Sequence, residues 1–164
     1  MLVKTKKAFL RANLVCVLIV PWLLCSSSFD KVRCEGEKTY VGSRACMECH
    51  ETEYENFTKF AKKSHSFNSI EVMKKGLTNE ELKKCFKCHT TGYGETSGFK
   101  SETETPHLKN AGCEVCHGPG SLHAETEDSE DIIGHLTQEI CETCHSSERV
   151  EAFHYKPLIY GGAH

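Results

Sequence analysis

The chain has 164 residues, of which 26% are charged and 38% are apolar, and its formal net charge at pH 7 is −3. This composition is typical of a soluble protein of one domain or two small ones, and its acidity argues against nucleic-acid binding. The 11 cysteines and 10 histidines depart from ordinary composition. They indicate either a disulfide scaffold or a protein that holds a metal or a prosthetic group through cysteine.

Residues 1–28 have the three parts of a secretory signal peptide. Residues 4–11 contain four positive charges and no acid, residues 14–24 are apolar, and residues 26–28 are serines. The apolar run is short for a bilayer span, so we expect cleavage, with an uncleaved anchor as the alternative. The mature domain, 29–164, would have a formal charge of −7 and no stable membrane span. We expect it to be exported to the periplasm or an equivalent extracytoplasmic compartment.

The mature chain first reaches the pattern Cys-x-x-Cys-His (CxxCH) at Cys46–His50. The residues that follow predict a helix over 51–65, because Tyr54, Phe57 and His65 fall on one helical face. This face is aromatic and ends in a histidine. It can therefore pack on a flat ring system and reach a metal ion.

A second CxxCH motif, Cys85–His89, lies at the end of another predicted helix. Thr78 is a favourable N-cap, and Glu81 three residues later completes a capping-box pattern at the start of this helix. Residues 90–106 are rich in glycine, serine and threonine, and they predict a loop.

The third motif, Cys113–His117, is followed by Gly118-Pro119-Gly120, which must end a helix and turn the chain. His123 comes six residues after the motif's own histidine. Because the chain turns between them, we expect His123 to serve the site of another motif. Residues 125–131 then contain five acids in seven residues, which indicates a solvated loop or a docking patch for a basic partner.

A fourth motif, Cys141–His145, should lie on a helix over 139–144. The first cysteines of successive motifs are 39, 28 and 28 residues apart, which is an irregular repeat rather than a solenoid. Outside the motifs, Cys34 of the mature chain is either an exposed thiol or one half of an intermolecular disulfide. The eight motif cysteines are Cys46, Cys49, Cys85, Cys88, Cys113, Cys116, Cys141 and Cys144.

Four CxxCH motifs in an exported chain predict four covalently attached haem c groups. The two cysteine sulfurs form thioethers with the haem vinyl groups, and the adjacent histidine binds the iron. Zinc ribbons need paired CxxC units but not the histidine, and a disulfide scaffold explains the cysteines alone. The predicted proximal iron ligands are His50, His89, His117 and His145.

The number of haems also predicts the fold class. Four haems in about 136 mature residues leave about 34 residues for each haem. A chain this short cannot build a large protein core and also enclose four porphyrins, so the porphyrins must form the core. We therefore expect a mostly α fold, in which short helices and long loops wrap around four stacked haems with little or no sheet.

Six histidines outside the motifs are candidates for the sixth coordination position of an iron. A histidine there gives a low-spin centre suited to electron transfer, whereas an open position can bind a substrate. The two strongest candidates are His65 and His123, from their positions described above. The others, which could equally be ordinary surface residues, are His107, His135, His154 and His164.

Six longer sequence segments in and around the motifs give more information than the CxxCH motifs themselves. They are YVGSRAC at 40–46, KSH at 63–65, CHTTGYG at 88–94, GCEVCHGPGSLH at 112–123, FHY at 153–155 and GGAH at 161–164. On these segments, which span residues 40–164, the chain resembles the cytochrome c-554 family of tetrahaem proteins, linked to nitrogen-oxidising bacteria and their relatives. This resemblance is far more specific than CxxCH alone.

The resemblance implies a mostly helical fold with haems stacked in pairs. Three haems would have two histidine ligands each, and one haem, that of His89, would be five-coordinate. His65, His123 and His164 fall where the family has distal ligands, so the three remaining histidines would be ordinary residues. His65 and His123 are expected to be exchanged between the first and third haems.

The predicted function is electron transfer between redox proteins in nitrogen-compound metabolism. In the family setting, the donor would be a hydroxylamine- or hydrazine-oxidising multihaem enzyme, and the acceptor a cytochrome or a quinone-linked protein. The sequence contains no recognisable acid–base pair, nucleophile or phosphate loop, so we name no catalytic residue. Two alternatives remain open: an enzyme that reduces or oxidises a small nitrogen compound such as nitric oxide at a five-coordinate haem, and a structural subunit of a larger multihaem complex.

Overall fold

The chain divides into two units, Met1–Glu35 and Gly36–His164. The computed structural model describes residues 36–146, which lie in the second unit. The predicted signal peptide, Cys34, His154 and His164 lie outside the described residues. Between residues 36 and 146, no helix is long and apolar enough to cross a membrane.

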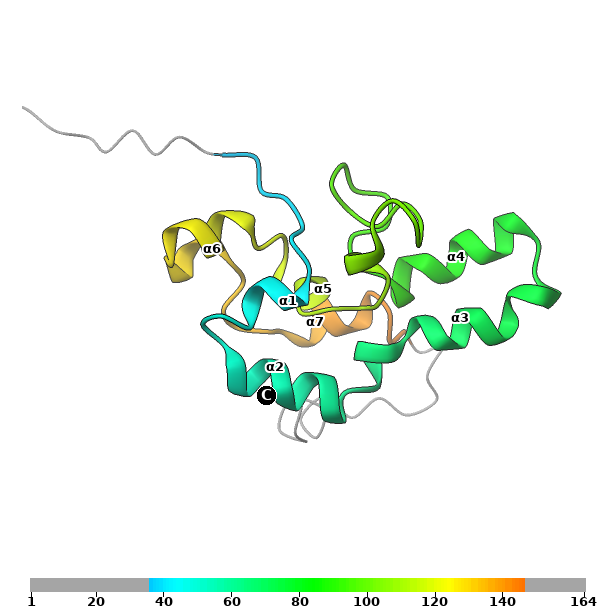
Figure 1. Cartoon of the computed structure of the whole chain (residues 1–164), viewed down its shortest axis with the longest axis horizontal. Coiled ribbons are helices and arrows are strands. Elements are labelled where there is room, and N and C mark those ends of the chain that lie inside the picture. The colour runs from blue at the N-terminus through cyan, green and yellow to red at the C-terminus, as the bar shows by residue number, and fades with distance from the viewer. Residues whose placement is uncertain (1–35, 147–164) are drawn as a thin grey trace, which may run out of the picture. The chain divides into compact units, whose positions relative to one another are not determined.

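Short helices joined by turns and loops make up the described residues, and residues 36–146 contain no strand (Figure 1). This confirms the predicted mostly α fold with short helices and little or no sheet. The α-helices are α1 (Ser43–Cys46), α2 (Glu51–Phe60), α3 (Phe67–Met73), α4 (Asn79–His89), α5 (Glu114–His117), α6 (Ser121–Thr126) and α7 (Gln138–Glu142). The 3₁₀ helices are η2 (Lys62–His65), η3 (Lys74–Gly76), η4 (Pro106–Leu108) and η5 (Ser129–Asp131).

The predicted continuous helix over 51–65 is wrong in its second part. Helix α2 ends at Phe60 because Ala61 adopts an extended backbone, with φ −82° and ψ 117°. Ser64 then donates a hydrogen bond from its hydroxyl to the carbonyl of Ala61 at 2.7 Å, and η2 follows as a separate turn. The helical face that was predicted to carry His65 is therefore interrupted. Similarly, α7 ends at Glu142 and the last motif is completed by a turn.

The predicted capping box at the start of α4 is confirmed. The hydroxyl of Thr78 accepts a hydrogen bond from the Glu81 amide at 3.3 Å, and the Glu81 carboxylate accepts one from the Thr78 amide at 2.9 Å. These two bonds satisfy backbone donors that a helix start leaves without partners. The helix then runs without a break through the second motif to His89.

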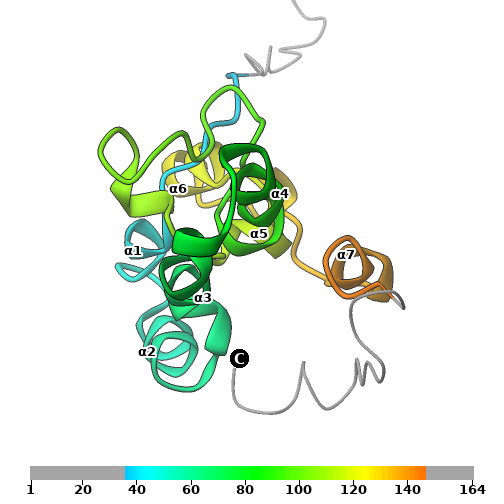
Figure 2. The same cartoon turned by 90° about the vertical axis from the view of Figure 1, so that its right-hand side faces the viewer.

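The core of the described residues is small. It consists of Phe67, Ile70, Phe99 and Leu108, with Phe86 packed against them. The ring of Phe86 lies 5.3 Å from that of Phe99, and the rings of Phe67 and Phe99 are 5.8 Å apart. These contacts hold α3 against α4, which lie side by side in both views (Figures 1 and 2).

Replacing Phe67 with alanine is expected to lower the free energy of unfolding by about 3–5 kcal/mol, because the ring fills the centre of this core and only 2% of the residue is exposed. Denaturant unfolding of the haem-loaded protein measures the change. Phe60→Ala is the control, since Phe60 is 57% exposed and its removal should change stability by less than about 0.5 kcal/mol. Equal stabilities of the two variants would contradict the assigned core.

Candidate haem-binding sites

Each CxxCH motif in the structure forms a single helical turn. The amide of the motif histidine donates to the carbonyl of the first cysteine at 2.9 Å in the first motif, 3.0 Å in the third and 2.9 Å in the fourth. The second motif forms the last turn of α4. A helical turn places residues i, i+3 and i+4 on one side, so both sulfurs and the imidazole of each motif can face one haem.

The eight motif cysteines fit covalent haem attachment chemically. All eight carry thiols rather than disulfides, which is the form that adds to a vinyl group. In each motif, the residue that follows the second cysteine is the histidine that would bind iron. When bound, a haem would supply the redox-active iron, and the chain would supply the two thioethers and the axial imidazole.

Backbone carbonyls orient two of the proximal histidines. Nδ1 of His89 donates to the carbonyl of Ser66 at 2.9 Å, and Nδ1 of His117 donates to the carbonyl of Ile133 at 2.7 Å. A carbonyl can only accept, so Nδ1 carries the hydrogen in both rings and the lone pair is on Nε2. This is the arrangement that prepares an imidazole to bind a metal through Nε2.

The proximal histidine of the fourth motif, His145, has a lowered pKa. The larger cause is burial of the ring, and the nearby positive charge of Lys63 adds to it. A lower pKa favours the neutral imidazole, which is the form that binds iron.

His123 lies beside the proximal histidine of the first motif. The ring centres of His50 and His123 are 6.1 Å apart, and the ring planes differ by 26°. A metal–imidazole bond is about 2.0–2.1 Å and an imidazole nitrogen lies about 1.1 Å from its ring centre, so two imidazoles on opposite sides of one iron have centres about 6.2–6.4 Å apart. The observed separation fits an axial pair. Nδ1 of His123 donates to the carbonyl of Asp128 at 2.9 Å, which again puts the lone pair on Nε2.

The first and third motifs approach each other through their first cysteines. A hydrogen bond between the two thiols raises the pKa of Cys46 and lowers that of Cys113 to about 6. A thioether has no proton to lose, so these directions describe the chain before haem attachment. The hydroxyl of Ser43 in α1 accepts from the amide of Cys113 at 3.0 Å and reinforces the contact. The first cysteines of the first and third motifs are therefore adjacent.

Comparison with known proteins identifies a family whose match covers three of the four motifs. Residues 45–118, which contain the first three motifs, match the family described as "Cytochrome c554 and c-prime". The chain resembles the cytochrome c554 family. Together with the CxxCH geometry, the resemblance supports a multihaem c-type cytochrome that binds haem covalently and transfers electrons.

A solved structure supports the same fold. The reduced state of cytochrome c554 from Nitrosomonas europaea superimposes with a TM-score of 0.54 at 19% sequence identity, over 76% of this chain and 83% of that chain. At this identity, the similarity shows the fold of a cytochrome c554. No curated protein sequence matches the chain.

The structure describes only some of the other histidines that were predicted as distal ligands. His65 is exposed, and its Nε2 lies 3.2 Å from the carbonyl of Thr58, so that nitrogen carries a hydrogen and points to the backbone. His107 and His135 are also exposed. The remaining two candidates, His154 and His164, lie outside the described residues. The roles of His65 and His164 thus stay predictions.

Two residues that position the motifs were missed by sequence reasoning. Ser66 joins the second motif to the segment that leads into the third, since its hydroxyl donates to the carbonyl of His89 at 2.8 Å and accepts from the amide of Ala111 at 2.9 Å. Glu114 lies between the cysteines of the third motif and is only 2% exposed. A glutamate in a variable CxxC position carries no local signal of burial. Its place in the segment GCEVCHGPGSLH, one of those on which the family resemblance rests, was the one available hint.

Proposed function

We propose that the protein is an exported tetrahaem c-type cytochrome that passes electrons between redox proteins. The observation that carries this proposal is the pairing of His50 with His123 at the separation of two axial ligands. An iron with two imidazole ligands has no open position for a substrate, so it is suited to gain and lose electrons. Close attachment points at Cys46 and Cys113 would in addition bring two haems near enough to exchange electrons.

Each of the four motifs would hold one haem. The motif histidines would be the proximal ligands, and the cysteine pairs the thioether anchors. The fourth motif lies beyond residue 118, where the family match ends, but it forms the same helical turn as the first and third motifs. This shared geometry supports a count of four.

The distal ligands of the other haems are assigned by the same reasoning. We assign His65 to the haem of His117, in exchange for His123. Burial raises the pKa of Cys116, and the charge of Lys63, two residues before His65, opposes this rise. The same charge lowers the pKa of His145, so η2 lies near both the third and the fourth motif. Ligation through Nε2 would require the His65 ring to leave the Thr58 carbonyl. His164 would serve a further haem, and the haem of His89 would be five-coordinate.

The proposed partners are a hydroxylamine- or hydrazine-oxidising multihaem enzyme as donor and a cytochrome or quinone-linked protein as acceptor. The acidic segment 125–131 offers a surface to a basic partner, because residues 125–130 are exposed. Asp131, in contrast, is buried and accepts a hydrogen bond from Thr126 at 2.7 Å, so it stabilises the segment itself. Nitrogen-compound metabolism is proposed from the family resemblance.

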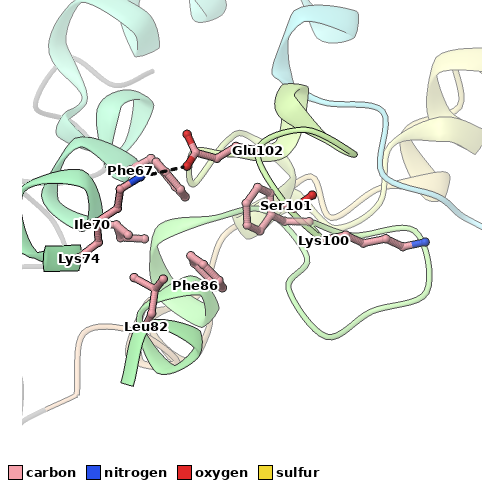
Figure 3. A pocket seen from close by; sticks show the side chains of 9 residues that line it. Phe67, Ile70, Lys74, Leu82, Phe86, Lys100, Ser101 and Glu102 are labelled. Atoms are coloured by element: carbon pink, nitrogen blue, oxygen red, sulfur yellow. Dashed lines mark ion pairs between the residues drawn. The ribbon is translucent and has the colours of Figure 1, made fainter. Parts of the chain in front are cut away.

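The alternative is a reductase or oxidase of a small nitrogen compound at the haem of His89. A cavity of about 180 Å³ lies next to the second motif, and Phe67, Ile70, Leu82 and Phe86 point into it (Figure 3). The ion pair between Lys74 and Glu102, 3.7 Å long, lies at its edge. The cavity is lined from the Phe86 side of α4 and not by His89, so electron transfer remains the better supported function.

Electron paramagnetic resonance and absorption spectra, recorded with and without nitric oxide, distinguish the two functions. We expect low-spin signals from haems with two histidine ligands, and no consumption of nitric oxide by the reduced protein. A single high-spin haem would be that of His89. Turnover of nitric oxide at this haem would overturn the assignment as an electron carrier and favour the enzyme.

A further inference from the structure

The carboxylate of Glu114 is buried inside the third motif, at the meeting point of two other segments. Its Oε1 accepts hydrogen bonds from the amide of Val41 at 2.9 Å and from the amide of Gly120 at 2.8 Å. Its Oε2 accepts from the amide of Gly42 at 2.7 Å. One side chain thus joins three parts of the chain.

The amides that Glu114 holds lie at the starts of the helices that lead to the axial pair. Gly42 is the N-cap of α1, which ends at Cys46, and a turn then leads to His50. Gly120 is the N-cap of α6, which carries His123 three residues later. The carboxylate therefore fixes the entry of both segments relative to the third motif.

Local backbone geometry leaves little room for another arrangement. Gly42 has a φ of +84°, which L side chains rarely adopt, and a Cβ on Gly120 would lie 3.2 Å from Oε1 of Glu114. Thr39 and Ser121 add two hydrogen bonds between the same segments, one from Ser121 N to Thr39 O at 3.1 Å and one from Thr39 N to Ser121 Oγ at 2.8 Å. The absence of a side chain at Gly120 lets its backbone approach the carboxylate closely.

Glu114 also brings a buried charge to the haem sites. Its two oxygens act only as acceptors, which is the hydrogen-bonding pattern of an ionised carboxylate. A buried anion stabilises the ferric form of a nearby haem more than the ferrous form, and this lowers the reduction potential. A neutral side chain of the same shape would lack this effect of charge on the potential.

We propose that Glu114 is a positioning residue that holds His50 and His123 on opposite sides of the first haem and lowers the reduction potential at the first and third motifs. This inference rests on the proposed function, because it takes the two histidines to be axial ligands of one iron. Glu114 is then the residue that sets the geometry of the two histidines.

The test uses the haem-loaded full chain with Glu114→Gln, Glu114→Ala and His123→Ala. The matched control is Glu142→Gln, since Glu142 has the same position in the fourth motif but is exposed. Spin state is read by electron paramagnetic resonance, and haem potentials by a spectroscopic redox titration. Glu114→Gln keeps the side-chain shape, so it decides the outcome if Glu114→Ala does not incorporate haem.

We expect Glu114→Gln to raise the potential of at least one haem and to alter one low-spin signal. Glu114→Ala should lose one low-spin signal, which added imidazole restores, and Glu142→Gln should match the wild type. If His123→Ala opens one haem while Glu114→Gln has wild-type signals and potentials, the role of Glu114 is overturned and the axial pair stands. If His123→Ala leaves every low-spin signal in place, the axial pair itself is wrong and the proposal is overturned with it.

Discussion

Replacing His123 with alanine is expected to convert one haem, the one attached at Cys46 and Cys49, from low spin to high spin. The ring of His123 lies 6.1 Å from that of His50, so its removal would leave that iron with one protein ligand. The reduced variant should therefore bind carbon monoxide at one more haem than the wild type. Electron paramagnetic resonance and carbon monoxide difference spectra measure the two effects.

Double variants identify which haem is opened. His50→Ala with His123→Ala should lose the same single low-spin signal, because both residues would serve one iron. His117→Ala with His123→Ala should lose two signals. His135→Ala is the matched control, since His135 is exposed and outside the axial pair. Loss of a single signal in the His117 double variant would mean instead that His123 serves the haem of its own motif.

Without haem attachment, the chain is expected to remain largely unfolded. Five apolar residues are buried between residues 36 and 146, namely Phe67, Ile70, Phe99, Leu108 and Ala111. The apolar area of so few side chains cannot offset the conformational entropy of ordering a chain of this length. The haem faces must supply the missing contacts.

Far-ultraviolet circular dichroism compares the haem-free and haem-loaded chains. We expect the haem-free chain to lose most of its helical signal and to show no cooperative thermal transition. The haem-loaded Phe67→Ala variant serves as reference, because it weakens the protein part of the core and leaves the haems attached. A cooperative transition in the haem-free chain would show that the polypeptide core suffices, and that the haems are not the core.

Features with a local cause were predictable from the sequence. The capping box of Thr78 and Glu81 needs residues three apart, and a CxxCH turn needs residues four apart. The turn at Gly118-Pro119-Gly120 predicted that His123 would serve the site of another motif, and the His123 ring lies 6.1 Å from that of His50. The placement of His123 beside the first motif was expected only through the family resemblance, because nothing local to His123 specifies a contact with residue 50.

Two features were missed, the early end of α2 and the burial of Glu114. Ala61 is a good helix former, yet it ends α2 by adopting an extended backbone, and the following turn is held by Ser64. Glu114 has a side chain that is ordinarily exposed, and it is buried because the amides of Val41, Gly42 and Gly120 converge on it. The contacts of Glu114 with Val41 and Gly42 join residues far apart in the sequence, so its burial cannot be calculated from the neighbouring residues.

The intact mass of the purified, denatured protein tests the central claim most directly. Thioether bonds survive denaturation, whereas a haem held only by axial ligands is released. We predict the mass of the mature chain, beginning near residue 29, plus four haem groups. A mass with three or fewer haems, or that of the polypeptide alone, would contradict the assignment of one covalent haem to each CxxCH motif.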